Sequence, residues 1–355
     1  MSPRYLAADL SAFAADLLCA AGQSKLCATV HAETLLEADL LGHDTHGLAL
    51  LPAHLTELQS GGMQRTGEPE IISDRGACVV WDGHHLSGPW LVSSATDLAI
   101  ERALKYGTCS IVIRRTHHIA CLAAFLRRAT DRDLMMLVAS SDPCNTNVAP
   151  HGGRQGLLSP NPIAAGIPTN DEPILIDVSM SITTNGMTQR LYNEGKRFTG
   201  AWLTDAKGHV SDDPAVMFAS PKGALLPLGG LDSGHKGYAL ALLVEALTNA
   251  LGGNGRAAVR GRNFWGGAAF IQVFDPDAFA GKAAFLRESS HLAAACRASA
   301  PRPGCDAVRL PGEAGTKRKA QQLRAGVSLY PGILPALAPW ADRYQLAMPK
   351  AMSHD

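Results

Sequence analysis

The sequence lacks any long hydrophobic run and any excess of charge of one sign. Its longest apolar runs, such as residues 238–244, are far shorter than the roughly 18 residues that a membrane-spanning helix needs. The 32 basic and 32 acidic residues give a formal net charge of zero. The one dense basic run, residues 317–319, is typical of a solvated helix face instead of a nucleic-acid-binding stripe. We therefore expect neither a membrane nor a nucleic acid as a partner.

Cysteine pairs at metal-site spacing are also missing. The eight cysteines are scattered and include no CxxC pair, which disfavours a disulfide framework and a thiolate zinc site.

The N-terminal residues pass directly into an amphipathic pattern, so we expect neither a signal peptide nor a lipid anchor. With 46% hydrophobic and 18% charged residues, the chain is not a disordered one. These features indicate a globular protein of the cytoplasm.

The familiar nucleotide-binding and catalytic signatures are absent. The nearest match to GxGxxG is residues 253–258, GNGRAA, which follow a helical pattern and not a strand, so we interpret them as a loop. The sequence contains no Walker A loop, no GxSxG elbow, no HExxH helix and no kinase motif set. A Rossmann-type dinucleotide domain is therefore not predicted.

Helical periodicity dominates both ends of the chain. The predicted helices cover residues 6–21, 48–59, 285–298, 312–326 and 332–344, with another between a cap at Ser24 and a stop at Gly42. We expect these helices to form one lobe, residues 1–72 plus 280–355, packed against a lobe of residues 73–279 that binds the cofactor and carries out catalysis.

Short β-rich runs alternate with helical patterns in the middle of the chain. The β-rich runs are residues 78–81, 109–113, 134–139, 174–178 and 270–274, and the helical patterns are residues 90–105, 120–130 and 235–251. Residues 143–222 contain more Gly, Pro and Asn turns than an all-parallel, doubly wound sheet needs. The pattern predicts an α/β fold with a mixed sheet flanked by helices.

Two polar loops carry histidines. The segment HDTHG, residues 43–47, lies between two predicted helices, and THH, residues 116–118, follows a predicted strand. Imidazole suits proton transfer near neutral pH, although each loop taken alone also fits a helix cap or a solvated turn. The four histidines show no helical HxxxH spacing and no carboxylate at a fixed spacing, so we expect no metal.

Two further segments suit the binding of ligands. Residues 230–237, GLDSGHKG, lead into a long apolar helix, and a glycine-rich approach with Lys236 fits a phosphate. The alternative is a capped helix with a solvated lysine. The turns at residues 145–153 and 159–162 offer side-chain amides to a ligand, but Asn-Pro is also common in ordinary turns.

Taken together and in order, these segments resemble the malate/L-lactate dehydrogenase family of the second type, also called sulfolactate-dehydrogenase-like. The resemblance covers nearly the whole chain and is closest to the hydroxycarboxylate dehydrogenase B branch. The matching segments are ADLLGHDTHG (38–47), THH (116–118), PNPIA (160–164), LID (175–177), HKGYAL (235–240) and LPGE (310–313). The resemblance implies a non-Rossmann nicotinamide-binding fold and a cytosolic homodimer. It also implies NAD(P)-dependent oxidoreduction between a 2-hydroxy acid and a 2-oxo acid, or between an amino acid and a cyclic imine.

The resemblance also assigns roles to residues. It implies that His118 transfers the proton and that His46 lies beside the nicotinamide, with Thr45 and Asp177 as further catalytic residues. The implied contacts to NAD or NADP are His46, Ala120, Cys121, Leu122, Leu175, Ile176, Asp177, Val178, Ser179, His235, Lys236, Gly267, Gly312, Glu313, Ala314 and Gly315. The implied substrate contacts are Leu50, His54, Asn145 and Pro160.

Three departures from the family pattern concern the substrate. Leu50 stands where many relatives have an arginine suited to clamp a carboxylate, His54 stands where a tyrosine is expected, and SPNP, residues 159–162, replaces GTNP. We therefore expect a 2-oxo acid with an apolar side chain in place of malate. The alternatives are cyclic imine reduction, a non-catalytic dinucleotide-binding protein and metal-dependent hydrolysis.

Overall fold

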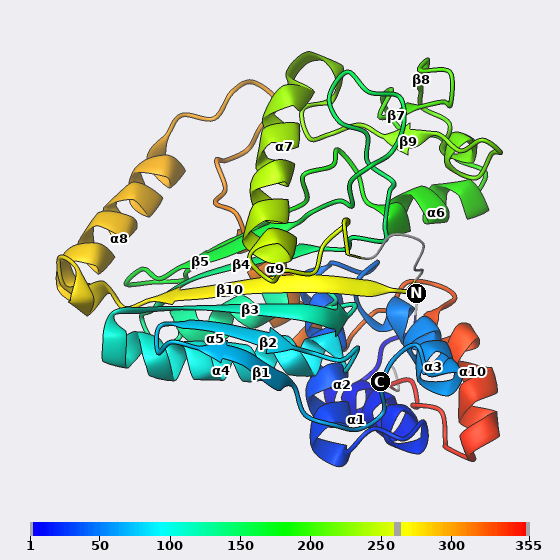
Figure 1. The fold of residues 1–355 in the computed structure, drawn as a ribbon, viewed down its shortest axis with the longest axis horizontal. Coiled ribbons are helices and arrows are strands. Elements are labelled where there is room, and N and C mark those ends of the chain that lie inside the picture. Colours follow the sequence, from blue (N-terminus) through cyan, green and yellow to red (C-terminus); the bar gives the residue numbers. More distant parts are fainter. Residues whose placement is uncertain (1–2, 259–263, 353–355) are drawn as a thin grey trace.

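The computed structural model describes residues 3–258 and 264–352. Its centre is a seven-stranded sheet in the order β1-β2-β3-β10-β4-β5-β6, accompanied by a small sheet, β8-β7-β9 (Figure 1). In the large sheet β2 and β3 pair in parallel and the other five neighbouring pairs are antiparallel. The prediction of a mixed sheet is confirmed. The strands are β1 (Glu70–Asp74), β2 (Cys78–Asp82), β3 (Thr108–His117), β4 (Met135–Ser141), β5 (Ile163–Ile167), β6 (Ile174–Val178), β7 (Leu203–Thr204), β8 (Val210–Ser211), β9 (Ala224–Leu225) and β10 (Gly266–Phe274).

The two central strands are apolar on both faces, which is why they occupy the middle of the sheet. On β3, Ile111 and Ile113 contribute to one hydrophobic core, whereas the intervening Val112 contributes to another with its partner Phe270 on β10. All five predicted β-rich runs form strands. Two strands of the large sheet were missed: β1 because it is mostly exposed, and β5 because its sequence, IAAGI, is short and rich in small residues.

Helices cover both faces of the large sheet (Figure 1). On one face, α4 packs on β3 and β10, and α5 packs on β4 and β5. On the other face, α7 and the π-helical turn η3 pack on β4. The helices are α1 (Ala7–Ala20), α2 (Lys25–Leu41), α3 (Leu51–Ser60), α4 (Gly88–Tyr106), α5 (Ala123–Thr130), α6 (Asn185–Asn193), α7 (Gly230–Glu245), α8 (Lys282–Ala298), α9 (Glu313–Ala325) and α10 (Ile333–Tyr344), with short turns η1 (Leu48–Leu50), η2 (Pro214–Met217), η3 (Ala246–Ala250) and η4 (Pro276–Ala278).

Helices from both termini share a third hydrophobic core. Leu10 and Leu17 of α1 pack with Leu35 of α2, Leu55 of α3 and Leu337 of α10, and all five side chains are almost fully buried. A backbone bridge between Tyr5 and Val327 ties the two ends of the chain together. Figure 1 shows α1, α2, α3 and α10 grouped at one end, whereas α8 lies far from them. Within the described residues, no helix combines the length and the hydropathy that crossing a membrane requires.

The predicted ends of the helices agree with the structure where the sequence contains a recognisable cap residue. The Ser24 hydroxyl accepts the Cys27 N–H at the start of α2, and Gly42 ends that helix with φ of 90°. Two of the predicted helix starts were wrong. The helix predicted from residue 120 begins at Ala123 because Ala120 is left-handed, with φ of 63°. The helix predicted from residue 235 begins five residues earlier, at Gly230, and α6 was not predicted.

Candidate active site

A cavity of about 360 Å³ lies at one end of the large sheet. The strands β3, β4 and β6 end there and β10 begins there, because the antiparallel pairings place these termini at the same sheet end. The loop that follows α2 closes the cavity from the side of the terminal helices. The predicted site residues that line it are Thr45, His46, Leu50, His118, Ala120, Cys121, Leu122, Asn145, Pro160, Asp177, Ser179 and Gly267.

Two histidine rings from distant loops meet in this cavity. The rings of His46 and His118 stack with centroids 6.0 Å apart and planes inclined by 26°. The Thr45 hydroxyl lies 2.9 Å from Nδ1 of His46, while Nδ1 of His118 accepts the backbone N–H of Ala120 at 3.2 Å. Because a backbone N–H can only donate, neutral His118 carries its proton on Nε2. That tautomer leaves an N–H group on the ring of His118.

The position of His118 depends on close backbone packing. A Cβ atom on Gly88, the first residue of α4, would lie 2.4 Å from the carbonyl oxygen of His117 and 2.5 Å from that of His118. Real Cβ atoms do not approach a carbonyl oxygen so closely, so this position requires glycine. The left-handed Ala120 then turns the chain so that its N–H points back to His118. Both features fix the imidazole relative to the sheet.

Burial controls the proton affinity of both rings. Burial lowers the pKa of His118, and the neighbouring His46 and His31 lower it further. Burial also lowers the pKa of His46, although the charge of Asp177 opposes this shift. Both imidazoles are therefore neutral near pH 7 in this structure. Protonation of either ring would be favoured by a negative charge brought into the cavity.

Asp177 connects the end of β6 to the loop before α5. Its Oδ2 accepts the backbone N–H of Ala123 at 2.8 Å and the thiol of Cys121 at 3.5 Å. Burial, together with Asp177, raises the pKa of the Cys121 thiol well above its usual value, so the thiol stays protonated. Among the described residues, none hydrogen-bonds to Oδ1 of Asp177. This oxygen is available to a ligand.

The residues present fit the part of a nicotinamide cofactor that contains the nicotinamide ring and its ribose. Cavities of about 300–1,000 Å³ hold ligands of this size, and a carboxylate with a free oxygen suits ribose hydroxyl groups. The predicted cofactor residues Leu175, Ile176 and Val178 lie on β6 next to Asp177 but do not line the cavity. Gly312 packs against Leu175, which places the start of α9, with Glu313, Ala314 and Gly315, next to the same strand.

Three predicted residues lie elsewhere in the structure. His235 and Lys236 are exposed on the second turn of α7 and do not line the cavity. Since α7 begins at Gly230, they do not occupy the amide-rich helix N-terminus on which their phosphate-binding role was predicted. His54, predicted to contact substrate, is fully buried behind His118, and its Nδ1 lies 2.8 Å from Nε2 of His31.

Trp265 also belongs to the site, although the sequence patterns did not point to it. This indole lines the cavity with its ring centroid 4.9 Å from that of His118 and 5.0 Å from that of His54. An aromatic residue directly before Gly266 and Gly267 at the start of a strand was the available signal. Trp265 gives this part of the cavity an apolar wall.

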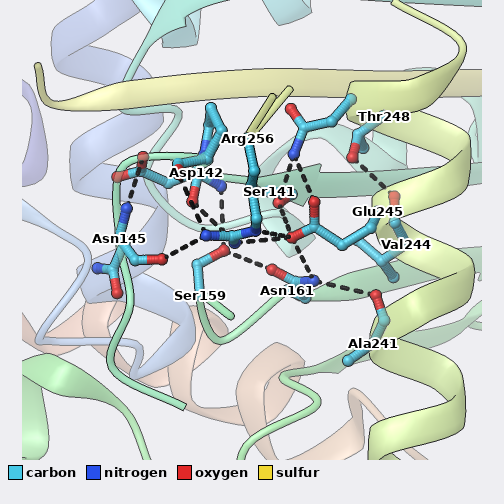
Figure 2. A network of polar contacts seen from close by, with 12 residues as sticks. Ser141, Asp142, Asn145, Ser159, Asn161, Ala241, Val244, Glu245, Thr248 and Arg256 are labelled. Atoms are coloured by element: carbon cyan, nitrogen blue, oxygen red, sulfur yellow. Dashed lines mark hydrogen bonds and ion pairs between the residues drawn. The ribbon is translucent and has the colours of Figure 1, made fainter. Parts of the chain in front are cut away.

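A polar network supports the other wall of the cavity (Figure 2). Its centre is an ion pair of 2.8 Å between Arg256 and Glu245. Arg256 also donates to the carbonyl oxygens of Asp142, Pro143 and Asn145, and Glu245 accepts from Ser141 and Asn161. Arg256 belongs to the GNGRAA segment, which is a loop as predicted. The loop thus holds the turn that carries Asn145.

Comparisons with known proteins identify the family and the fold. Residues 6–338 match the family model described as malate/L-lactate dehydrogenase. The chain is 30% identical to an L-lactate dehydrogenase of Cupriavidus necator, over 90% of this chain and 92% of the relative. It is 31% identical to a Δ1-pyrroline-2-carboxylate/Δ1-piperideine-2-carboxylate reductase of Pseudomonas syringae, over 86% and 87%. A crystal structure of malate dehydrogenase from Entamoeba histolytica shares the fold, with a TM-score of 0.90 at 23% identity over 99% of this chain and all of the other.

Proposed function

This chain belongs to the malate/L-lactate dehydrogenase family, and from that premise we propose that it transfers hydride between NAD or NADP and a 2-oxo acid/2-hydroxy acid pair. The observation that carries the proposal is the convergence of His46 and His118 over one cavity that Asp177 also lines. The two imidazoles can donate or accept the proton of the reaction, while the free carboxylate oxygen of Asp177 can bind the cofactor beside them. When bound, the nicotinamide supplies or accepts the hydride.

The cofactor is held by residues at the ends of β3 and β6. Asp177 and Ser179 would hold the ribose, and the loop of residues 120–122 would face the nicotinamide ring. The other residues of 175–178 lie beside Asp177 on β6, and the contact of Gly312 with Leu175 brings residues 312–315 at the start of α9 next to this strand. We also propose that His235 and Lys236, which are exposed on α7 outside the cavity lining, contact the cofactor phosphates.

The proton is supplied by the His46 and His118 pair. An imidazolium donates to the alkoxide that develops on the substrate, and the neutral ring acts as base in the reverse direction. Because both rings are neutral near pH 7, the anionic substrate must bring in the charge that favours proton uptake. Thr45 can accept from Nδ1 of His46 once that ring is charged, because a hydroxyl group serves as donor or acceptor.

The cavity favours a 2-oxo acid with an apolar side chain. Leu50 and Trp265 supply apolar walls, and the lining that the structure describes contains no Lys or Arg. Asn145 and Asn185 offer neutral amides to the single carboxylate. A second carboxylate, as in oxaloacetate, would lose its hydration without a cationic partner among these residues.

We also propose that the protein is a cytoplasmic homodimer with two lobes, residues 1–72 plus 280–355 and residues 73–279, although α8 of the first lobe lies apart from its other helices. Among the described residues, Cys19, Cys27, Cys78, Cys109, Cys121, Cys296 and Cys305 form no disulfide, which suits a reducing compartment. Leu240 and Leu243 of α7 are 45% and 49% exposed, so this helix presents apolar surface that a second subunit can cover. Sedimentation equilibrium tests the dimer, and a monomer at all concentrations contradicts it.

The test of the activity is an absorbance assay of NADH and NADPH against 2-oxo acids with side chains of increasing size. We expect His118→Gln and His46→Gln each to lower kcat about 10²–10⁴-fold, because each removes a ring from proton transfer. His291→Gln on exposed α8 is the matched control and should keep full activity. Wild-type turnover in both cavity variants would refute the assignment.

Cyclic imine reduction is the second candidate. The similarity to a pyrroline/piperideine-carboxylate reductase favours it, and the acidic groups Asp142 and Asp177 in the cavity lining suit a protonated imine. Faster turnover of Δ1-pyrroline-2-carboxylate than of any 2-oxo acid would establish this alternative. Binding of NADPH without turnover of either class would indicate a non-catalytic dinucleotide-binding protein.

A further inference from the structure

Three side chains with different donor atoms converge on one wall of the cavity. His43 follows α2, Cys121 precedes α5 and Asp177 lies on β6, yet one ligand atom from each lies within 4.8 Å of the other two. Nothing in their spacing along the sequence signals a site, because they are separated by more than fifty residues at each step. Tertiary packing alone brings them together.

The donor set matches that of a soft divalent cation. Zn²⁺ accepts thiolate, imidazole and carboxylate ligands at about 2.0–2.3 Å, which places tetrahedral ligand atoms roughly 3.5 Å apart. Sγ of Cys121 and Oδ2 of Asp177 are already 3.5 Å apart. Three protein ligands with an open fourth position form a common coordination pattern for zinc.

Two of the three ligands are already fixed and the third is free to adjust. Cys121 is 4% exposed, and the backbone N–H of Ala123 holds Asp177 at 2.8 Å. The exposed His43 ring has no hydrogen bond or ion pair to any described residue. A movement of His43 on the order of 1 Å would complete the tetrahedral geometry.

We propose that His43, Cys121 and Asp177 bind Zn²⁺ or a similar soft divalent cation, and that the bound ion inhibits the enzyme by excluding the nicotinamide cofactor. On binding, the S–H bond of Cys121 breaks, its proton passes to solvent and the thiolate sulfur bonds to the ion; no electron is transferred. Exclusion follows because the ion would occupy the part of the cavity, beside Asp177 and residues 120–122, in which the cofactor is proposed to bind. This inhibitory consequence rests on the proposed function, whereas metal binding does not.

Co²⁺ alone is the direct probe, because a thiolate–cobalt bond produces a charge-transfer absorption. We expect the wild-type protein to show this band and to saturate at one equivalent. Cys121→Ser should abolish it, and His43→Gln should weaken Co²⁺ binding by more than about tenfold. Cys305→Ser, an exposed cysteine outside the cavity, is the matched control and should retain the band.

His43→Gln also guards against misfolding, because this side chain is exposed and forms no hydrogen bond or ion pair with a described residue. Loss of the band in Cys305→Ser, or its persistence in Cys121→Ser, would overturn the proposal. Reduced-nicotinamide fluorescence provides the second measurement: Zn²⁺ should raise the apparent Kd of NADPH in the wild type and have little effect on it in His43→Gln. An active enzyme with no cobalt band refutes only the metal site, while a cobalt band in a protein without turnover refutes only the dehydrogenase activity.

Discussion

The chemistry of single residues in this cavity is set by burial and by hydrogen-bond partners that lie close in sequence. His118 receives the N–H of Ala120, two residues away, and His46 pairs with the adjacent Thr45. Such local contacts could be anticipated from the loop motifs. The position of His54 could not, since its contact with His31 joins two helices. A histidine on a helix face looks the same in sequence whether it faces a cavity or a core.

Leu50 is the residue through which we propose that the cavity selects its substrate. It lines the cavity without full burial, so Leu50→Arg can place a guanidinium beside the substrate. We expect kcat/KM for oxaloacetate relative to pyruvate to rise about 10–100-fold, the gain for a hydrogen bond to a charged group. Leu50→Met is the control that keeps the apolar preference. An unchanged ratio in Leu50→Arg would show that residue 50 does not contact the distal end of the substrate.

At the scale of elements, the cavity depends on loops fastened to helices. The Arg256 and Glu245 side chains are only 21% and 16% exposed, and together they join the end of α7 to the turn at Asn145 (Figure 2). A buried pair of this kind leaves an uncompensated charge when one partner is removed. The network therefore stabilises the cavity wall as well as the fold.

Arg256→Met tests this role. We expect it to lower the free energy of unfolding by about 3 kcal/mol, because Glu245 stays buried without its cationic partner. Arg197→Met is the control: Arg197 is 62% exposed and pairs with Asp212 and Asp213 at the surface, where an ion pair contributes less than about 1 kcal/mol. Urea unfolding of both variants supplies the comparison, and equal losses would contradict the account.

The start of α9 offers a second test at this scale. Gly312 and Gly332 both precede helices with left-handed φ angles of 89° and 97°. A Cβ atom on Gly312 would lie 2.7 Å from Cβ of Leu175, whereas one on Gly332 would meet nothing within 4 Å. In both alanine variants the left-handed backbone lowers the free energy of unfolding by about 1–2 kcal/mol. Because only Gly312→Ala also creates a steric clash, we expect thermal or urea unfolding to show that it is less stable than Gly332→Ala by about 1–3 kcal/mol. Equal stability would mean that α9 moves freely relative to β6.

At the scale of the whole molecule, buried histidines make stability depend on pH. His31, His54 and His117 are 0% exposed. Burial lowers the pKa of His31 from 6.5 to about 3, and burial lowers the pKa of His54 and His117 well below 6.5. The unfolded chain therefore binds more protons than the native state below pH 6.5, and the native state loses stability as the pH falls.

Two carboxyl groups oppose this trend. Burial raises the pKa of Asp39 from 3.8 to about 7 and that of Asp142 to about 6. Their stabilising effect is complete below pH 3.8 and is lost as the pH rises through those values. Burial also lowers the pKa values of His46 and His118. Five histidines against two carboxyl groups therefore leave a net uptake of more than one proton on unfolding between about pH 6 and pH 4.

We therefore expect the free energy of unfolding to fall by more than about 1.4 kcal/mol per pH unit in that range. Asp39→Asn removes one opposing group and should steepen the fall. Urea unfolding between pH 7 and pH 4 measures both slopes. Stability that stays constant or increases on acidification would show that the three imidazoles are not buried in the native state.

The amino-acid sequence alone determined the mixed α/β class, the capped ends of the early helices, the central strands and the family, because these follow from local periodicity, cap residues and ordered motifs. It also placed His46, His118 and Asp177 in the candidate site. Only the tertiary structure decided which side chains face the cavity: it revealed Trp265, put His54 behind His118 and joined Cys121 to His43 and Asp177. The physical reason is that antiparallel pairing and helix packing, which act between residues distant in sequence, choose the neighbours of each side chain.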